Sequence, residues 1–167
     1  ILVYPSGLVA TIISVFLLYK AGFFGDMMMN FYYSVMSVYG WWNWARKKDN
    51  VPVLGISRTT INEKSVGVLM FFLTMLVTYG VYSFYDYELT TTNYIDIVTS
   101  GIFFTAMWYM ANKKIENWIL WIIADVITVP LYAYRGLGML SLQYLIFTIL
   151  AIQGYLQWKK HLSNSKQ

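Results

Sequence analysis

The chain of 167 residues contains no cysteine, one histidine and three prolines. The absence of cysteine excludes disulfides and thiolate metal sites, and it leaves the redox compartment undetermined. Charged residues make up only 12% of the sequence, too few to cover the surface of a soluble globular domain. The sequence also has no Walker loop, no zinc-binding His-Glu pattern and no Ser/His/Asp constellation. We therefore expect neither ATP-driven transport within this chain nor a hydrolase.

What the chain does contain is apolar surface: 58% of its residues are hydrophobic and 19% are aromatic. Its mean hydropathy is +0.51. Apolar runs recur between short charged segments, and a run of about 20 residues forms a helix about 30 Å long, enough to cross a bilayer. The sequence therefore predicts an all-α, polytopic transmembrane helical bundle that lies in the lipid bilayer.

The charged segments divide the chain into about six spans. We predict these spans at residues 1–19, 27–45, 65–85, 94–111, 115–134 and 137–158. If the spans alternate across the membrane, ten Lys and Arg residues fall on one side and only Lys20 and Arg135 on the other. Positive residues accumulate in the cytoplasm, so we expect a multi-pass protein of the inner (plasma) membrane with a cytoplasmic C-terminus. The net charge of +4 then reflects topology, and we expect no nucleic-acid partner.

An internal repeat organises the spans. Segment 39–44 (YGWWNW) resembles segment 153–158 (QGYLQW), and each follows a polar residue, Asn30 or Gln143, by a similar interval. Spans one and two thus match spans five and six in the same membrane orientation, which is typical of parallel repeats. The alternative is that short aromatic and glycine similarities arise from composition.

The repeat predicts two three-helix units joined by a linker helix, with the first helix missing. The expected divisions are 1–45 as an incomplete first repeat, 46–64 as a cytoplasmic loop, 65–93 as linker helix and outer loop, 94–160 as the second repeat, and 161–167 as a cytoplasmic tail. The chain starts with Ile1 inside an apolar run, which is the reason for expecting an absent first helix.

Asp125 is the strongest candidate for a functional residue, because it stands midway along the apolar span 115–134. A carboxylate at the centre of a membrane costs roughly 2.5 to 3.5 kcal/mol on insertion scales and usually faces a cavity or a partner. At helical spacing it shares a stripe with Trp118, Trp121 and Thr128. Two indoles and a negative charge suit a flat cationic ligand.

Further polar residues are candidates for contacting the rest of such a ligand. Asn117, Thr128, Asn30 and Gln143 offer amides and a hydroxyl for hydroxyl or ring-nitrogen groups. Several candidates have a structural alternative. Trp118 is able to anchor at the interface, Trp121 and Asp125 to hydrogen-bond a neighbouring helix, and Asn30 and Gln143 to hold helices together. The sequence predicts no metal site and no cofactor.

The segment Asn117-Trp118-x-x-Trp121, with an acid or amide four residues later, resembles the PnuC family of nicotinamide riboside transporters. The resemblance also includes Tyr39-Gly40-Trp41, Asp96, Tyr132, Gly136, Gln143-Tyr144 and Gly154, so it covers nearly the whole chain except 47–64. It implies a fold of three, one and three helices similar to the SWEET sugar transporters, and a homotrimer. This chain has Asp125 where many nicotinamide riboside transporters have Asn.

The resemblance implies facilitated diffusion of nicotinamide riboside, which cytoplasmic phosphorylation then traps. Thiamine is an alternative substrate, since its thiazolium is also a flat cation, whereas uncharged riboflavin fits the stripe least well. Two other classes stay open at this stage. An intramembrane enzyme would use Asp125 as an acid or base, and a structural subunit would fill the aromatic stripe with a neighbouring helix.

Overall fold

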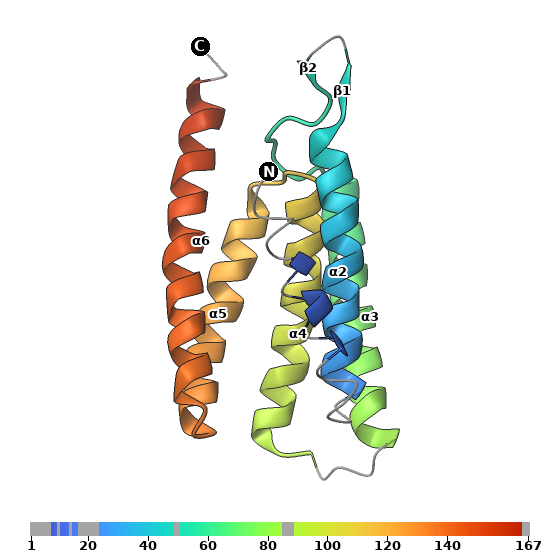
Figure 1. The fold of residues 1–167 in the computed structure, drawn as a ribbon, viewed down its shortest axis with the longest axis vertical. Coiled ribbons are helices and arrows are strands. Elements are labelled where there is room, and N and C mark those ends of the chain that lie inside the picture. The colour runs from blue at the N-terminus through green and yellow to red at the C-terminus, as the bar shows by residue number, and fades with distance from the viewer. Residues whose placement is uncertain are drawn as a thin grey trace. The chain divides into compact units, whose positions relative to one another are not determined.

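The computed structural model describes residues 8–9, 11–13, 15–16, 24–48, 51–84 and 89–164. Nearly all of the described chain is helical, as Figure 1 shows. The long helices are α2 (Phe24–Ala45), α3 (Ile61–Phe84), α4 (Thr91–Ala111), α5 (Glu116–Tyr134) and α6 (Gly138–Asn164). The predicted all-α fold class is confirmed.

These long helices coincide with five of the predicted spans. The first predicted span, 1–19, lies largely outside the described residues, although those described between 8 and 16 are helical. Even α5, with 19 residues, is about 28 Å long, close to the thickness of a bilayer core. Among the described residues, α3, α5 and α6 combine this length with high hydropathy. Helices α2 and α4 are as long but richer in Tyr, Trp, Ser and Thr, which hydropathy scales rate low.

The chain divides into two compact units, which we describe separately. The first unit comprises Ile1–Gly55 with Met110–Lys113, and the second comprises Ile56–Tyr109 with Lys114–Gln167. The predicted assignment of two repeats and a linker helix remains a prediction.

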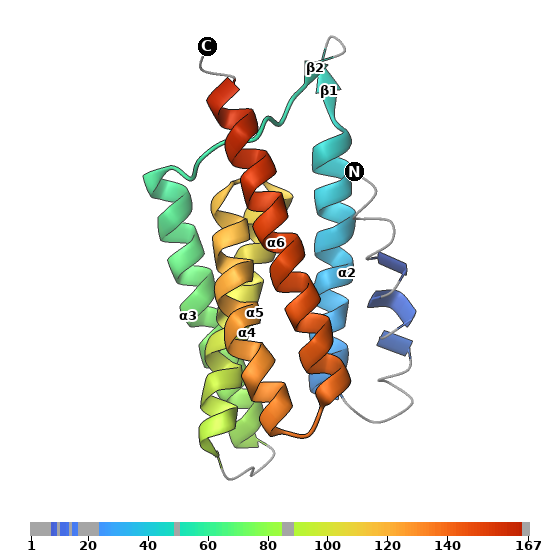
Figure 2. The same cartoon turned by 90° about the vertical axis from the view of Figure 1, so that its left-hand side faces the viewer.

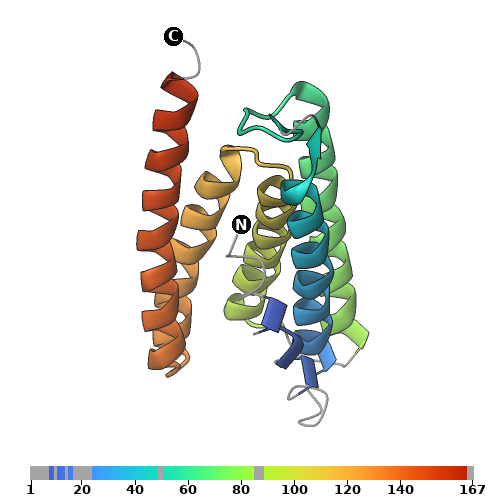
Figure 3. The same ribbon diagram turned by 45° about the horizontal axis from the view of Figure 1, so that its top comes forward.

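In the first unit, α2 leads into a short antiparallel ladder, whose strands are labelled in Figures 1 and 2. Figure 3 shows the same segment in teal, with the top of the view brought forward. Strand β1 (Lys47–Lys48) pairs with β2 (Val51–Pro52). The backbone N–H of Val53 extends the ladder by donating to the carbonyl of Arg46 at 3.1 Å. We predicted only a loop here, because two-residue strands carry no periodic hydrophobic signal.

In the second unit, α3 and α4 approach each other closely at glycines. A Cβ added to Gly101 would lie 2.8 Å from Cδ2 of Phe71 and 3.0 Å from the Phe71 carbonyl oxygen. The hydroxyl of Thr105 donates to the carbonyl of Gly67 at 3.2 Å. Small residues at a helix contact are typical of membrane proteins, where packing rather than water drives helix association.

Substituting Gly101 with Ala should lower the free energy of unfolding by about 1 to 3 kcal/mol, as overpacking does in other cores. The cause is that the Phe71 carbonyl belongs to the backbone and cannot move aside. Thermal unfolding in detergent measures the effect. Gly80 on α3 is the matched control, because nothing lies within 4 Å of its added Cβ. Gly80→Ala should leave the stability unchanged or raise it, and an equal loss in both variants would contradict the role of the contact.

Helices α5 and α6 form a hairpin and lie side by side in Figures 1 and 2. Gly136 in the connecting turn has a φ of 74°, a left-handed conformation that favours glycine. The hydroxyl of Ser141 on α6 donates to the carbonyl of Val129 on α5 at 2.8 Å. The turn and this hydrogen bond therefore hold the end of α5 against the beginning of α6.

Side-chain caps set where α3 and α4 begin. The backbone N–H of Thr60 donates to the Glu63 carboxylate at 2.8 Å, and the Glu63 N–H donates back to the Thr60 hydroxyl at 3.3 Å. This is a capping box. At α4, the N–H of Thr90 donates to Oδ1 of Asn93 at 3.0 Å. Helix α3 consequently starts at Ile61. The apolar run alone predicts a start four residues later, at residue 65.

The distribution of apolar side chains suits a bilayer. Large apolar side chains such as Leu69, Leu76 and Ile149 are at least half exposed. Ala106 and Ala124 are fully buried. Alanines thus lie at contacts between helices together with a few larger side chains such as Phe103 and Leu131, whereas many long apolar side chains face outward. This arrangement belongs to a multi-pass membrane protein, since lipid solvates the outer surface.

Candidate functional site

Helix α5 gathers polar and aromatic side chains on one face. Asn117, Asp125 and Thr128 are only 0%, 1% and 3% exposed. Trp118 and Trp121 are half-buried on the same stripe. The structure therefore places these residues on one helix face. Spacing of three and four positions predicted this for the stripe from Trp118 to Thr128, and Asn117, predicted separately as a ligand contact, lies on the same face.

Several buried atoms on this face have no hydrogen-bond partner among the described residues. They are Asn117 Oδ1, Trp118 Nε1, Trp121 Nε1 and Asp125 Oδ1. An unsatisfied buried polar atom costs about 1 to 3 kcal/mol, so folded proteins rarely retain one without a reason. Two donors and two acceptors on one buried face are what a polar ligand needs from its site.

Two of the polar side chains on this face are held in place by backbone carbonyls. The amide nitrogen of Asn117 donates to the carbonyl of Lys114, which leaves Oδ1 as the unsatisfied atom. The hydroxyl of Thr128 donates to the carbonyl of Ala124 at 2.7 Å. Its oxygen therefore remains available only as an acceptor.

Aromatic rings from other helices flank the stripe. Phe103 on α4 lies 5.4 Å from Trp121 and 5.9 Å from Tyr144 of α6, measured between ring centroids. Tyr132 lies 5.3 Å from Tyr144. Sequence reasoning assigned neither Phe103 nor Tyr144 to the site. Tyr144 had one signal, its place within the resembling segment, whereas nothing distinguished Phe103 from other aromatic residues in the spans.

The two remaining predicted site residues lie elsewhere. Gln143 is on α6 with an exposed side chain, while the neighbouring Tyr144 contacts the aromatic rings. Asn30 is on α2 and belongs to the first unit. A binding role for either residue stays a prediction.

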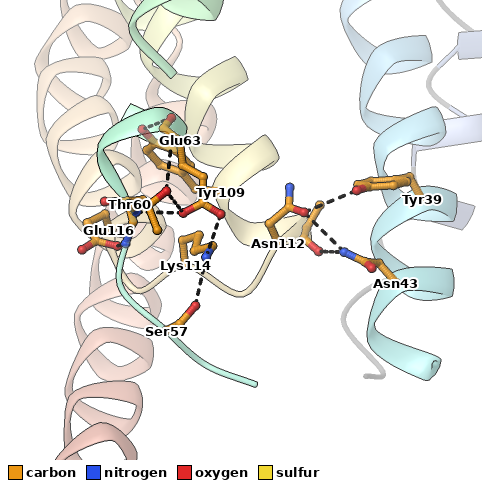
Figure 4. Close-up of polar contacts among 11 residues, drawn as sticks. Tyr39, Asn43, Ser57, Thr60, Glu63, Tyr109, Asn112, Lys114 and Glu116 are labelled. Atoms are coloured by element: carbon orange, nitrogen blue, oxygen red, sulfur yellow. Dashed lines mark hydrogen bonds and ion pairs between the residues drawn. The ribbon is translucent and has the colours of Figure 1, made fainter. Parts of the chain in front are cut away.

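A polar cluster secures the start of α5 (Figure 4). Lys114 is only 9% exposed; its Nζ forms an ion pair with Glu63 at 2.8 Å and donates to the Ser57 hydroxyl at 3.0 Å. The carboxylate of Glu116 accepts the N–H of Thr59 at 3.0 Å. These bonds fasten the segment before α3 to the beginning of α5, within one turn of Asn117.

In the first unit, side chains at the end of α2 satisfy the terminal carbonyls of α4. The side-chain amide of Asn43 donates to the carbonyl of Ala111 at 3.0 Å. The indole N–H of Trp44 donates to the carbonyl of Met110 at 3.1 Å. Helix ends leave such carbonyls without intrahelical partners. Lys113, two residues after Ala111, donates from Nζ to the carbonyl of Leu54 at 2.8 Å, and burial lowers its pKa.

The hollows found on the described surface differ in character from the α5 face. Two shallow hollows, one on α2 and one along α3 and α4, are lined by apolar and aromatic side chains and include none of the α5 residues. Within the described ranges, His, Asp and Glu side chains nowhere gather in threes as metal ligands do. The polar face of α5 is therefore the strongest candidate.

Comparisons with known proteins point to transport. The family model described as "Nicotinamide mononucleotide transporter" matches residues 1–160. The nicotinamide riboside transporters PnuC of Escherichia coli (strain K12) and Shigella flexneri are each 43% identical to this chain over 53 residues, 32% of its length. The matched part spans 22% of the length of each relative.

A solved structure has a similar fold. The crystal structure of the vitamin B3 transporter PnuC superposes with a TM-score of 0.69 at 21% identity. The alignment covers 96% of this chain and 72% of the other. At this identity the likeness concerns the fold.

Proposed function

This chain belongs to the nicotinamide mononucleotide transporter family, and we propose that it carries nicotinamide riboside across the membrane by facilitated diffusion. The α5 face supports the proposal, because unsatisfied donors and acceptors are buried there beside a carboxylate. The riboside has a flat pyridinium cation and a ribose. An indole face attracts a desolvated cation by about 2 kcal/mol, and Asp125 supplies the counter-charge. Ribose hydroxyls are able to donate to Asn117 Oδ1 and to accept from an indole N–H.

The charges on α5 favour the riboside over the mononucleotide. Helix α5 contains Glu116 and Asp125 but no lysine or arginine. The mononucleotide adds a phosphate, which needs a cationic or N–H-rich partner and is repelled by a nearby carboxylate. Cytoplasmic phosphorylation after entry would therefore trap the substrate, because its product fits the site poorly.

Thiamine is the second candidate substrate, and Asp125 is the observation that favours it. Both ligands are permanently charged flat cations, so the charge of Asp125 does not separate them. Thiamine is favoured only because this position departs from the Asn of many resembling nicotinamide riboside transporters. Riboflavin has no charge for Asp125 to balance.

A thermal-shift comparison of these ligands tests the proposal. A ligand present at about 100 times its Kd stabilises the folded protein by roughly 2.7 kcal/mol. We expect nicotinamide riboside to raise the melting temperature of the purified protein and riboflavin to leave it unchanged. A larger shift with thiamine would assign the site to the second candidate. No shift with either cation would contradict the proposed function, and conversion of the riboside on incubation would indicate an enzyme.

We further propose a homotrimer in the inner (plasma) membrane, with the C-terminus in the cytoplasm. The family resemblance supports the trimer. The ten positive residues on one side of the predicted topology support the orientation.

Cysteine labelling tests that orientation, and the native chain contains no cysteine to interfere. Val53 and Ser163 are exposed positions on the predicted cytoplasmic side. Val53→Cys and Ser163→Cys should resist an impermeant thiol reagent in intact cells and react once the membrane is permeabilised. Labelling of both positions from outside would reverse the orientation.

A further inference from the structure

Helix α6 provides a fitted surface for the indole of Trp118. A Cβ added to Gly154 would lie 2.7 Å from Cη2 and Cζ2 of that ring and 2.8 Å from Cε2. Real Cβ atoms do not approach carbon this closely, so the ring rests where only a glycine leaves room. Gly154 therefore fixes how near Trp118 lies to α6.

A second residue on α6 fixes the angle of the same ring. Trp158 lies one turn beyond Gly154 and meets Trp118 edge to face, with centroids 5.4 Å apart and an interplanar angle of 85°. Edge-to-face pairs are a preferred aromatic geometry. The indole N–H of Trp118 is buried and has no hydrogen-bond partner among the described residues, so packing alone orients it.

We propose that Gly154 is a positioning residue for the ligand. By seating Trp118 against α6, it directs the indole N–H toward the ligand on the α5 face. This inference rests on the proposed function. In the first unit, α2 also has a glycine followed by a tryptophan four positions later, Gly40 and Trp44. Gly40 is buried, and the indole N–H of Trp44 donates a hydrogen bond to the carbonyl of Met110.

A double-mutant cycle tests the proposal. Gly154→Ala should weaken binding of nicotinamide riboside about 10-fold, since a small misplacement of a binding group has a large effect on affinity. Gly138 on the same helix is the matched control, because nothing lies within 4 Å of its added Cβ. Gly138→Ala should leave the Kd unchanged.

The second arm of the cycle asks whether Trp118 carries the effect. In a Trp118→Phe background the smaller ring leaves room for the new methyl group, so Gly154→Ala should weaken binding by less than about 3-fold further. An equal factor in both backgrounds would overturn the proposal. If Gly154→Ala does not fold, Trp158→Leu removes the aromatic edge contact instead and should also weaken binding, and an unchanged Kd would overturn the proposal.

A ligand-free readout separates failure of this inference from failure of the proposed function. The near-UV circular dichroism that Trp118→Phe removes reports the packing of that indole. Gly154→Ala should alter this signal in the wild-type background and leave the spectrum of Trp118→Phe unchanged. If the wild-type protein binds no nicotinamide riboside, the proposed function is wrong, whereas an unaltered spectrum on Gly154→Ala shows that Gly154 does not position Trp118.

Discussion

Asp125→Asn should weaken binding of a cationic vitamin by about 5-fold to 150-fold, which corresponds to a loss of 1 to 3 kcal/mol. The side chain is 1% exposed, and its Oδ1 has no partner among the described residues. Asparagine keeps the size and most of the hydrogen bonding but removes the charge that balances the ligand. Titrating nicotinamide riboside and thiamine into wild type and variant measures the effect on each.

The control for this substitution is Ile123→Ala, because Ile123 is 44% exposed and lies off the polar face of α5. It should leave both affinities unchanged. Because many resembling transporters of the riboside have Asn at this position, the variant should retain that ligand better than thiamine. Unchanged affinity for both cations would remove Asp125 from the site and leave it as a residue that packs helices.

Lys114→Met should lower the free energy of unfolding by about 2 kcal/mol. Removing one partner of a fully buried ion pair costs about 3 to 5 kcal/mol, and solvent reduces the cost here because the side chains are 11% and 28% exposed. The substitution leaves Glu63 without its cation and Ser57 without a donor. Thermal or denaturant unfolding in detergent gives the change.

Lys64→Met is the matched control, since Lys64 follows Glu63 directly but is exposed. Its effect should stay within about 0.5 kcal/mol, as for most surface substitutions. Combining Lys114→Met with Glu63→Gln should cost less than the sum of the two single changes, because the second removes the charge that the first leaves unpaired. Strict additivity would show that the pair does not stabilise the fold.

The helices were predictable because a membrane demands long apolar segments of a fixed minimum length. Where the predicted ends differ, polar chemistry decides them. The capping box of Thr60 and Glu63 starts α3 before its apolar run, and α6 continues past Trp158 through Lys159 and Lys160. Charged residues outside the bilayer extend a helix as readily as apolar ones, so hydropathy does not reveal its end.

The candidate site was predictable along α5 but not across helices. Spacing along one helix places Trp118, Trp121 and Asp125 on one face without knowledge of its neighbours. The contribution of Phe103 depends on how α4 packs, which local periodicity does not encode. The burial of Lys114 was missed for the same reason: in the sequence it is one of two adjacent lysines, and only the fold pairs it with Glu63.

The length of α6 has a practical consequence for imaging this chain, whose mass is only 19.5 kDa. Its 27 residues extend about 40 Å, whereas a bilayer core is about 30 Å thick. The surplus is a continuous polar helix ending at Asn164, outside the apolar segment. A helical fusion partner joined in register at Asn164 would inherit the direction of α6 as a rigid extension. It would give each particle a feature that projects from the micelle and reports any rotation of that helix between conformations.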